Sequence, residues 1–223
     1  PIQTTNFLLS LSRLAVGTDY GVATARSSSF DQPLTPTQFN LRFSNTQGTY
    51  APLRALQIDQ RGVFVQRSNR RIYMMEFTNQ SFDFKTIDLT RLNPDIGIPG
   101  FVDFSIQRQI DTRLHFVRTD GQIATLIFDA DDEVYAWYRL ATSTGDSFEN
   151  VAILPSPLED AVYTIANRTV GGATKRYIER FARLDETQDF VTPALSDSYV
   201  TYAGVSTATI TGLSHLEGRT VCA

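Results

Sequence analysis

The chain has 223 residues, of which 42% are hydrophobic, and its 20 basic side chains stand against 24 acidic ones for a net charge of −4. No run of about 18 apolar residues is present, which excludes a membrane-spanning helix, and no signal-peptide pattern opens the sequence. The acidic balance argues against a dedicated binder of duplex DNA, because such a protein carries a basic excess.

Short runs rich in β-branched and aromatic residues, bounded by Gly, Asp, Asn or Ser, follow one another along the chain and predict strands. They are Val63–Val65, Ile72–Met75, Leu114–Val117, Ile123–Phe128 and Glu133–Tyr138. A helical turn is expected after Asp88, a good N-cap, ending before Pro94. Residues 176–184 fit an amphipathic helix and residues 175–181 fit a strand, and we prefer the strand because Gly171-Gly172 upstream favours a hairpin turn. The class is all-β.

Four tight turns between apolar runs recur at a regular interval. Their marker residues Thr18, Arg67, Arg118 and Arg168 are 49, 51 and 50 residues apart. A unit of about 50 residues with about four short strands has the size of a propeller blade. The alternative is a β-sandwich, whose turns recur every 8–12 residues or so without a longer period. The sequence therefore predicts β-propeller-like repeats over residues 1–185.

The middle strands of a propeller blade are covered by neighbours on both faces. This explains why Val63–Val65 and Ile72–Met75 are continuous apolar runs rather than alternating ones. Near Asp185–Asp189 the sequence becomes polar and charged, and residues 199–210 alternate again. We interpret residues 186–223 as a linker and the start of a second small β domain, and the chain as an incomplete piece of a larger subunit.

Groups that carry chemistry are scarce. The two histidines, His115 within a predicted strand and His215 in a predicted turn, lie beside no Gly-x-Ser-x-Gly nucleophile motif, and we interpret His115 as structural. The lone Cys222 excludes an internal disulfide and a thiolate metal site. The acidic segment 129–133 lacks calcium-loop spacing and is interpreted as a solvated turn. We therefore expect no enzyme, no cofactor and no metal site.

Aspartates can form the carboxylate pairs of glycoside hydrolases, which occur on many propellers. Candidates for such pairs are Asp103, Asp111, Asp120 and Asp160. The chemistry depends on the distance between the two carboxylates, which the sequence does not give. Asn167–Thr169 matches the glycosylation triplet, and we interpret it as part of the hairpin turn.

Arginines supply the one basic cluster. Eighteen of the 20 basic residues are arginines, whose planar guanidinium favours fixed contacts, although a genomic preference for arginine codons gives the same count. Arg61, Arg67, Arg70 and Arg71 fall within eleven residues, beside Phe64 and Tyr73. We take the four as candidate interface or channel residues, facing a nucleic-acid backbone or an acidic neighbour; the alternative is a solvated loop.

Taken in order, several segments resemble the tail nozzle proteins of short-tailed bacteriophages and prophages, also called tail tubular protein B or packaged-DNA stabilization proteins. The matching segments are Leu14–Thr18, Leu34–Pro36, Asn45–Gly48, Val63–Arg67, Asp88–Thr90, Val117–Gly121, Glu133–Trp137, Arg168 with Arg176–Arg180, and Ile210–Gly218. Each is weak alone, and their order over nearly the whole chain carries the resemblance. The turn Ser68–Arg70 and the segment 105–112 depart from the family pattern.

The resemblance implies a non-catalytic virion subunit of the phage tail, assembled in the bacterial cytoplasm. It implies a ring of copies of the chain, six being expected, below the portal and adaptor proteins, with packaged DNA passing transiently through the channel. A net charge of −4 suits sliding passage, because strong phosphate binding would hold the genome. The alternative is a glycan-binding propeller of a tail or surface adhesin, for which one tryptophan, Trp137, is weak support.

Overall fold

The structure, a computed structural model, describes residues 4–27, 32–130, 132–183, 202–214 and 217–218. The chain forms two compact units, residues 1–102 and 103–223. Four antiparallel sheets account for the regular structure of the described residues, so the all-β prediction is confirmed. The described residues contain one short helix, a single turn of 3-10 helix, η1 (Pro94–Gly97). None of their helices is long and apolar enough to cross a membrane.

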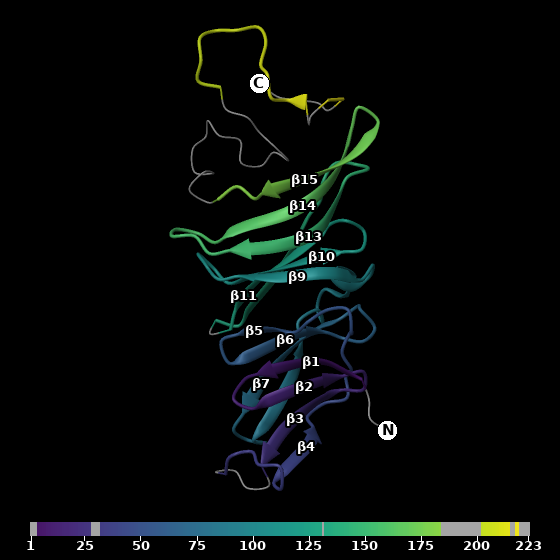
Figure 1. The fold of residues 1–223 in the computed structure, drawn as a ribbon, viewed down its shortest axis with the longest axis vertical. Coiled ribbons are helices and arrows are strands. Elements are labelled where there is room, and N and C mark those ends of the chain that lie inside the picture. Colours follow the sequence, from purple (N-terminus) through teal and green to yellow (C-terminus); the bar gives the residue numbers. More distant parts are fainter. Residues whose placement is uncertain (1–3, 28–31, 131, 184–201, 215–216, 219–223) are drawn as a thin grey trace. The chain divides into compact units, whose positions relative to one another are not determined.

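Each sheet is a meander in which every strand pairs with the next one along the chain (Figure 1). Sheet A contains β1 (Thr5–Ser10), β2 (Leu14–Thr18), β3 (Val22–Ser27) and β4 (Phe39–Phe43), and sheet B contains β5 (Leu56–Ile58), β6 (Arg61–Val65), β7 (Ile72–Thr78) and β8 (Asp83–Asp88). Sheet C contains β9 (Phe101–Gln107), β10 (Arg113–Arg118), β11 (Ile123–Asp129) and β12 (Val134–Leu140). Sheet D contains β13 (Ser147–Leu154), β14 (Ala161–Val170) and β15 (Ala173–Arg180).

In the first unit, sheet A packs face to face on sheet B. Small residues of sheet A, Ala15 and Val22, receive the bulky Phe64 and Met75 of sheet B in one buried cluster. Gly17 is required here, because a Cβ at this position would lie 2.3 Å from the ring of Phe7. Alternation along each strand thus places one apolar face of sheet A on sheet B.

A buried carboxylate joins the same two sheets. Asp83 of β8 accepts hydrogen bonds from the hydroxyls of Thr24 (2.8 Å) and Ser44 (2.6 Å) and from the backbone N–H of Phe84 (2.9 Å). Burial alone would raise the pKa of Asp83, but these hydrogen bonds to the charged form outweigh it and hold the pKa below its usual value. The ionised carboxylate therefore fixes β8 to the end of sheet A.

The two continuous apolar runs of the first unit are buried on both faces of their strands. In β6, Val63, Phe64 and Val65 are at most 2% exposed, and in β7 the adjacent Met74 and Met75 are fully covered. Side chains that point to opposite faces of these strands are therefore both removed from water. This confirms the interpretation of the runs as doubly covered middle strands.

In the second unit, sheet C packs on sheet D. Val117 and Ile123 of sheet C share a buried cluster with Phe148, Val162 and Ala166 of sheet D. Here too an aspartate joins the sheets: Asp103 of β9 accepts hydrogen bonds from the Asn150 side chain (2.8 Å) and the Val151 backbone N–H (3.1 Å) of β13.

The four predicted turns occupy equivalent places, since each joins the second and third strands of its sheet. In sheet D the turn is Gly171-Gly172, with φ of 57° and 78°, as a two-residue hairpin requires. The preferred strand over residues 175–181 is confirmed up to its last residue, because β15 covers Ala173–Arg180. Asn167–Thr169 belongs to β14 rather than to the turn itself.

Three of these turns also bind the segment that leads into the next sheet. The carbonyl of Thr18 accepts the backbone N–H of Thr49 (2.9 Å), and the carbonyl of Gly121 accepts that of Phe148 (2.8 Å). The Asn69 side chain accepts the backbone N–H of Phe101 (3.1 Å) and donates to its carbonyl (3.0 Å). A hydrogen-bonded connection of the same kind therefore follows each of sheets A, B and C.

One local prediction is wrong. The expected helical turn between Asp88 and Pro94 is a hydrogen-bonded turn, in which Asp88 accepts the N–H (2.8 Å) and hydroxyl (2.7 Å) of Thr90. The short helix instead begins at Pro94, whose fixed φ suits a first helical position and whose ring disfavours helix before it. The predicted domain boundary near residue 185 lies outside the described residues, as do His215 and Cys222.

Candidate functional site

The structure separates the four candidate arginines. Arg61 opens β6, whereas Arg67, Arg70 and Arg71 belong to the turn that joins β6 to β7. This turn is closed by hydrogen bonds from the backbone N–H of Gln66 to the Arg71 carbonyl (2.9 Å) and from that of Asn69 to the Gln66 carbonyl (2.7 Å). Arg61 therefore lies at the other end of the strand from its three sequence neighbours.

Arg61 and Arg71 form ion pairs within sheet B. Arg61 lies across from Glu76 of β7, with 3.4 Å between Nε and Oε2. Arg71 lies 3.5 Å from the carboxylate of Asp88 and donates to the carbonyl of Thr90 (3.1 Å). Burial, followed by the charge of Asp88, raises the pKa of the neighbouring Tyr73, and Arg71 opposes this effect. Both guanidinium groups therefore lie beside carboxylates of the same sheet.

Arg67 and Arg70 are the exposed pair of the four. Arg67 is tied down at its base, because its backbone N–H donates to the Gly48 carbonyl (3.3 Å) and its guanidinium to the Asp19 carbonyl (3.1 Å). The Arg70 side chain has no hydrogen bond or ion pair to any described residue. The candidate basic surface is thus reduced to this turn, where two positive side chains flank the exposed Ser68.

His115 lies in a closed polar network of the second unit. Its Nδ1 lies 3.0 Å from the hydroxyl of Thr125 and its Nε2 lies 3.0 Å from the amide oxygen of Gln107, whose own nitrogen reaches Glu159 at 3.3 Å. Burial, helped by the charge of Arg113, lowers the pKa of His115 to about 4. The ring is neutral at neutral pH and only 2% exposed, which agrees with a structural histidine.

The four aspartates named as possible glycosidase pairs each have a structural partner. Asp103 joins sheets C and D as described, and Asp160 accepts the backbone N–H groups of Arg108 (2.7 Å) and Gln109 (2.9 Å). Asp111 pairs with Arg113 and Asp120 with Arg118, both at 2.9 Å. Among the described residues no group of three or more His, Cys, Asp or Glu side chains could hold a metal ion.

The sequence analysis did not identify one exposed feature, the outer strand β4. All five of its residues are exposed, including Phe39, Leu41 and Phe43, and Tyr20 packs edge-on against Phe43 with ring centroids 5.4 Å apart. The alternation Phe-Asn-Leu-Arg-Phe is the signal that could have revealed it, because it is typical of a half-buried strand.

Trp137, the one tryptophan, is no free platform for a sugar. It is half-buried in β12 and packs against Phe116 of β10, with ring centroids 5.7 Å apart.

Compared with known proteins, the chain matches no protein-family model, and no curated protein matches it significantly.

Proposed function

We propose that this chain is a structural subunit of a bacteriophage tail, a nozzle or tail-tube protein that assembles into a ring below the portal and adaptor proteins. Packaged DNA passes transiently through the channel of this ring. The subunit acts in the virion after assembly in the bacterial cytoplasm, and it acts by assembly rather than by catalysis.

The observation that carries this proposal is the repeated unit: consecutive meander sheets, equivalent turns about 50 residues apart, and a hydrogen-bonded connection from a turn to the next sheet. Sheets of this kind, added one after another and packed face to face, are the construction of propeller blades. The same units contain the ordered segments that resemble the tail nozzle family, so fold and resemblance favour one function.

The state of the charged groups supports a passive channel rather than a strong DNA-binding surface. Two of the four candidate arginines are ion-paired in sheet B, so Arg67 and Arg70 are the exposed members of this cluster. Phosphate binding strengthens with the number of phosphates neutralised, so this cluster alone gives a weak, easily released contact. A genome that must slide requires such weak contacts.

Assembly with the portal–adaptor complex of the same phage tests the proposal. We expect analytical ultracentrifugation to show several copies of the chain bound to the complex, and negative-stain images to show a ring of six. A chain that stays monomeric in the presence of the complex would refute the proposal. Saturable binding of an oligosaccharide with a change in Trp137 fluorescence would instead favour the glycan-binding propeller.

A further inference from the structure

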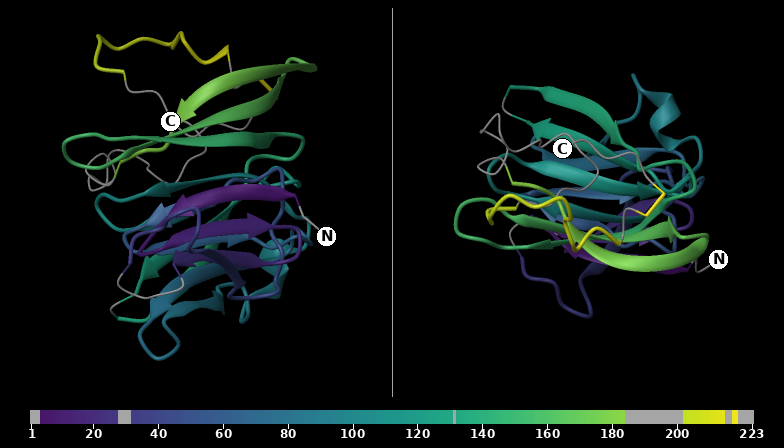
Figure 2. Two further views of the ribbon diagram at one scale, coloured as in Figure 1. Left: turned by 60° about the horizontal axis from the view of Figure 1, so that its bottom comes forward. Right: turned by 90° about the horizontal axis from the view of Figure 1, so that it is seen from above.

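The outer edge of strand β4 is open to a partner strand. β4 is the last strand of sheet A, with β3 on one side, and no strand of the described residues pairs with its other side (Figure 1; two further views in Figure 2). All five residues of β4 are exposed. An open edge of this kind is a template for a further strand, whose nature follows from the groups that the edge presents.

The hydrogen bonds between β3 and β4 determine which backbone groups point outward. The N–H of Ser44 donates to the Val22 carbonyl (2.9 Å), and these two residues lie opposite each other if the register of the two strands is continued. Hydrogen-bonded pairs alternate with non-bonded pairs along antiparallel strands. Arg42 and Asn40, two and four residues before Ser44, therefore also bond inward to β3.

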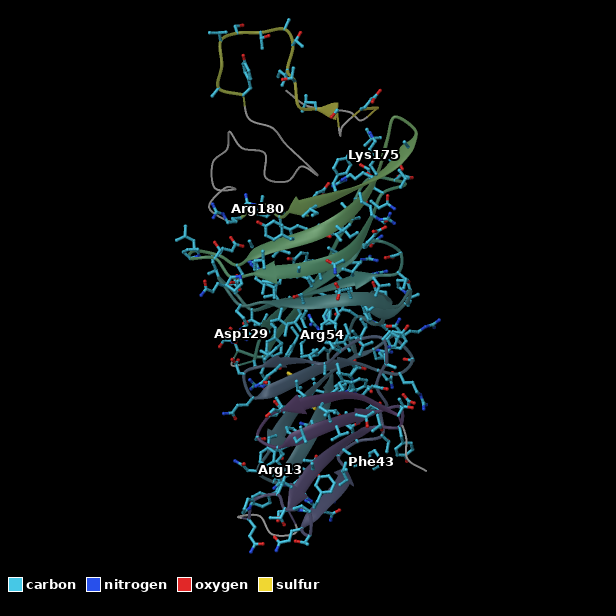
Figure 3. All side chains as sticks on the ribbon, in the orientation of Figure 1. Arg13, Phe43, Arg54, Asp129, Lys175 and Arg180 are labelled. Carbon is cyan, nitrogen blue, oxygen red and sulfur yellow. The ribbon has the colours of Figure 1, made fainter. Side chains whose placement is uncertain are left out.

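The other three residues of β4 present their N–H and carbonyl groups at the outer edge. They are Phe39, Leu41 and Phe43, and no described residue hydrogen-bonds to them on that side. Their side chains share one face of the strand and are 52%, 46% and 47% exposed, and Phe43 is labelled in Figure 3. The edge thus offers both free backbone groups and an apolar row beside them.

The usual devices that protect a sheet edge are missing from β4. Edge strands are commonly blocked by a bulge, a proline or several charges. The register of β4 on β3 is regular, and β4 contains no Pro or Gly and a single charged residue, Arg42. By contrast, β1 at the opposite edge of sheet A has a register shift between Thr5 and Phe7, and β15 of sheet D carries four charged residues.

The apolar pattern of β4 is symmetric about its central residue. Phe39 and Phe43 are equally far from Leu41, so an antiparallel second copy centred on Leu41 places Phe39 opposite Phe43 at both ends. Every outward-pointing residue then belongs to a hydrogen-bonded pair, which exchanges two bonds. On the other face Asn40 lies opposite Arg42 of the second copy, where the amide oxygen can accept from the guanidinium.

Other antiparallel registers fit less well. Outward-pointing groups meet each other only if the register shifts by two residues, which moves the centre to Arg42 or to Asn40. A centre at Arg42 places two like charges directly opposite each other, which is destabilising. A centre at Asn40 leaves Phe43 beyond the paired residues. The register centred on Leu41 is therefore the one in which the strand complements itself.

We propose that β4 pairs with β4 of a second copy of this chain, antiparallel and centred on Leu41, so that two copies of sheet A form one continuous sheet. The contact uses the same edge of both copies and closes after two, unlike the head-to-tail contacts that build a ring. The inference therefore goes beyond the proposed function and does not depend on it. Two five-residue strands make an interface smaller than the roughly 800 Å² per partner of standard complexes, so the dimer is weak and concentration-dependent.

Backbone amide exchange of the full chain tests the pairing directly. Measured by NMR, the amides of Phe39, Leu41 and Phe43 should exchange fast in dilute protein and at least about tenfold more slowly in concentrated protein. The amides of Asn40 and Arg42, bonded to β3, should be protected at both concentrations. Sedimentation velocity of the same samples should show a monomer–dimer equilibrium. A protein that stays monomeric, or one that associates without protecting the three outward amides, would overturn the inference.

A matched pair of substitutions at Leu41 isolates the backbone contribution. Proline removes the outward N–H, which an edge strand tolerates, whereas valine is similar in size and keeps the N–H. Leu41→Pro should weaken the dissociation constant of the dimer at least about 30-fold, and Leu41→Val less than about threefold. Equal dissociation constants for the two variants would show that the edge of β4 is not the contact.

Two substitutions of Asn40 test the register and decide the proposal even if Leu41→Pro unfolds. Asn40→Asp places a carboxylate opposite Arg42 of the second copy and should tighten the dimer several-fold, whereas Asn40→Arg places like charges there and should weaken it. A dimer that both substitutions weaken alike would rule out this register. Leu92→Asp, 90% exposed in the turn after β8, is the control and should leave the dissociation constant unchanged. Thermal midpoints measured in parallel show that each variant is folded.

Discussion

Protonation of His115 gives a pH dependence of stability with a calculable size. The folded protein holds the ring neutral with a pKa of about 4, whereas the ordinary value is 6.5. As the pH falls below about 6.5, His115 of the unfolded chain therefore binds a proton, whereas His115 of the folded chain stays neutral. The stability that depends on a neutral His115 is present in full above this pH and is lost as the pH falls toward the folded pKa.

The magnitude follows from the two pKa values. Each pKa unit corresponds to about 1.36 kcal/mol, so the full loss would be about 3.4 kcal/mol. Between about pH 7.5 and about pH 4.5, before the folded state itself protonates, the loss should be about 2.5 kcal/mol. Nearby groups act in the expected directions: Arg113 disfavours the protonated ring, and the carboxylate of Glu159 reaches the network only through Gln107.

Urea unfolding of the wild type and of a His115→Gln variant over this pH range measures the effect. Glutamine can still bond to Thr125 and Gln107 but does not titrate in this range. Both proteins contain the same carboxylates and His215, so those contributions cancel in the difference between the two curves. We expect the wild type to lose about 2.5 kcal/mol more than the variant on acidification. Parallel curves would refute the assignment of a strongly depressed pKa to the buried ring.

Three further substitutions test single contacts. Asp83→Ala removes the carboxylate that joins sheets A and B and should lower the free energy of unfolding by about 3 kcal/mol, measured with urea at neutral pH. A loss below about 1 kcal/mol would show that the hydroxyls of Thr24 and Ser44 find other partners. Arg168→Ala removes a guanidinium, 6% exposed, that pairs with the buried carboxylate of Asp146, and it should cost about 3–5 kcal/mol. An unchanged unfolding midpoint would contradict a buried ion pair. Gly97→Ala places a Cβ 1.9 Å from the Arg70 carbonyl oxygen and should cost about 1–3 kcal/mol of folding stability, measured as a lower thermal midpoint. A midpoint equal to that of the wild type would show that the backbone around Arg70 shifts without cost.

Much of the fold could be predicted because the residues that form its turns are close together in the sequence. A hairpin turn depends on a few residues, such as Gly171-Gly172, and the four turns recur at one interval, so their equivalence was visible before any strand pairing was known. Continuous apolar runs such as Val63–Val65 likewise report that both faces of a strand are buried.

The candidate site could be predicted only in part, because the partner of a charged side chain depends on register. Arg61 and Arg71 cluster with Arg67 in the sequence, but the pairing of β6 with β7 places Arg61 across from Glu76 at the far end of the strand. Asp88, which lies 17 residues after Arg71, becomes its neighbour only when β8 pairs with β7. A count of arginines in a window does not contain this information.

The exposed outer strand β4 was missed for a different physical reason. Alternation in Phe39–Phe43 indicates that one side of a strand is apolar, but it does not say whether a neighbour covers that side. Only the burial of β4, exposed along all five residues, distinguishes an open face from a covered one.

The strictly consecutive pairing of strands has a consequence for how the protein is made. Each strand of a meander pairs with the one synthesised just before it, so sequence separations between paired strands stay short, which favours rapid folding. The face of sheet A that holds Phe7, Ala15 and Val22, however, has its complete partner only when β8, with Phe84, has followed β6 and β7 out of the ribosome. During synthesis the chain therefore passes through an interval in which an apolar face of its first sheet is only partly covered, and the arrival of β8 ends that interval.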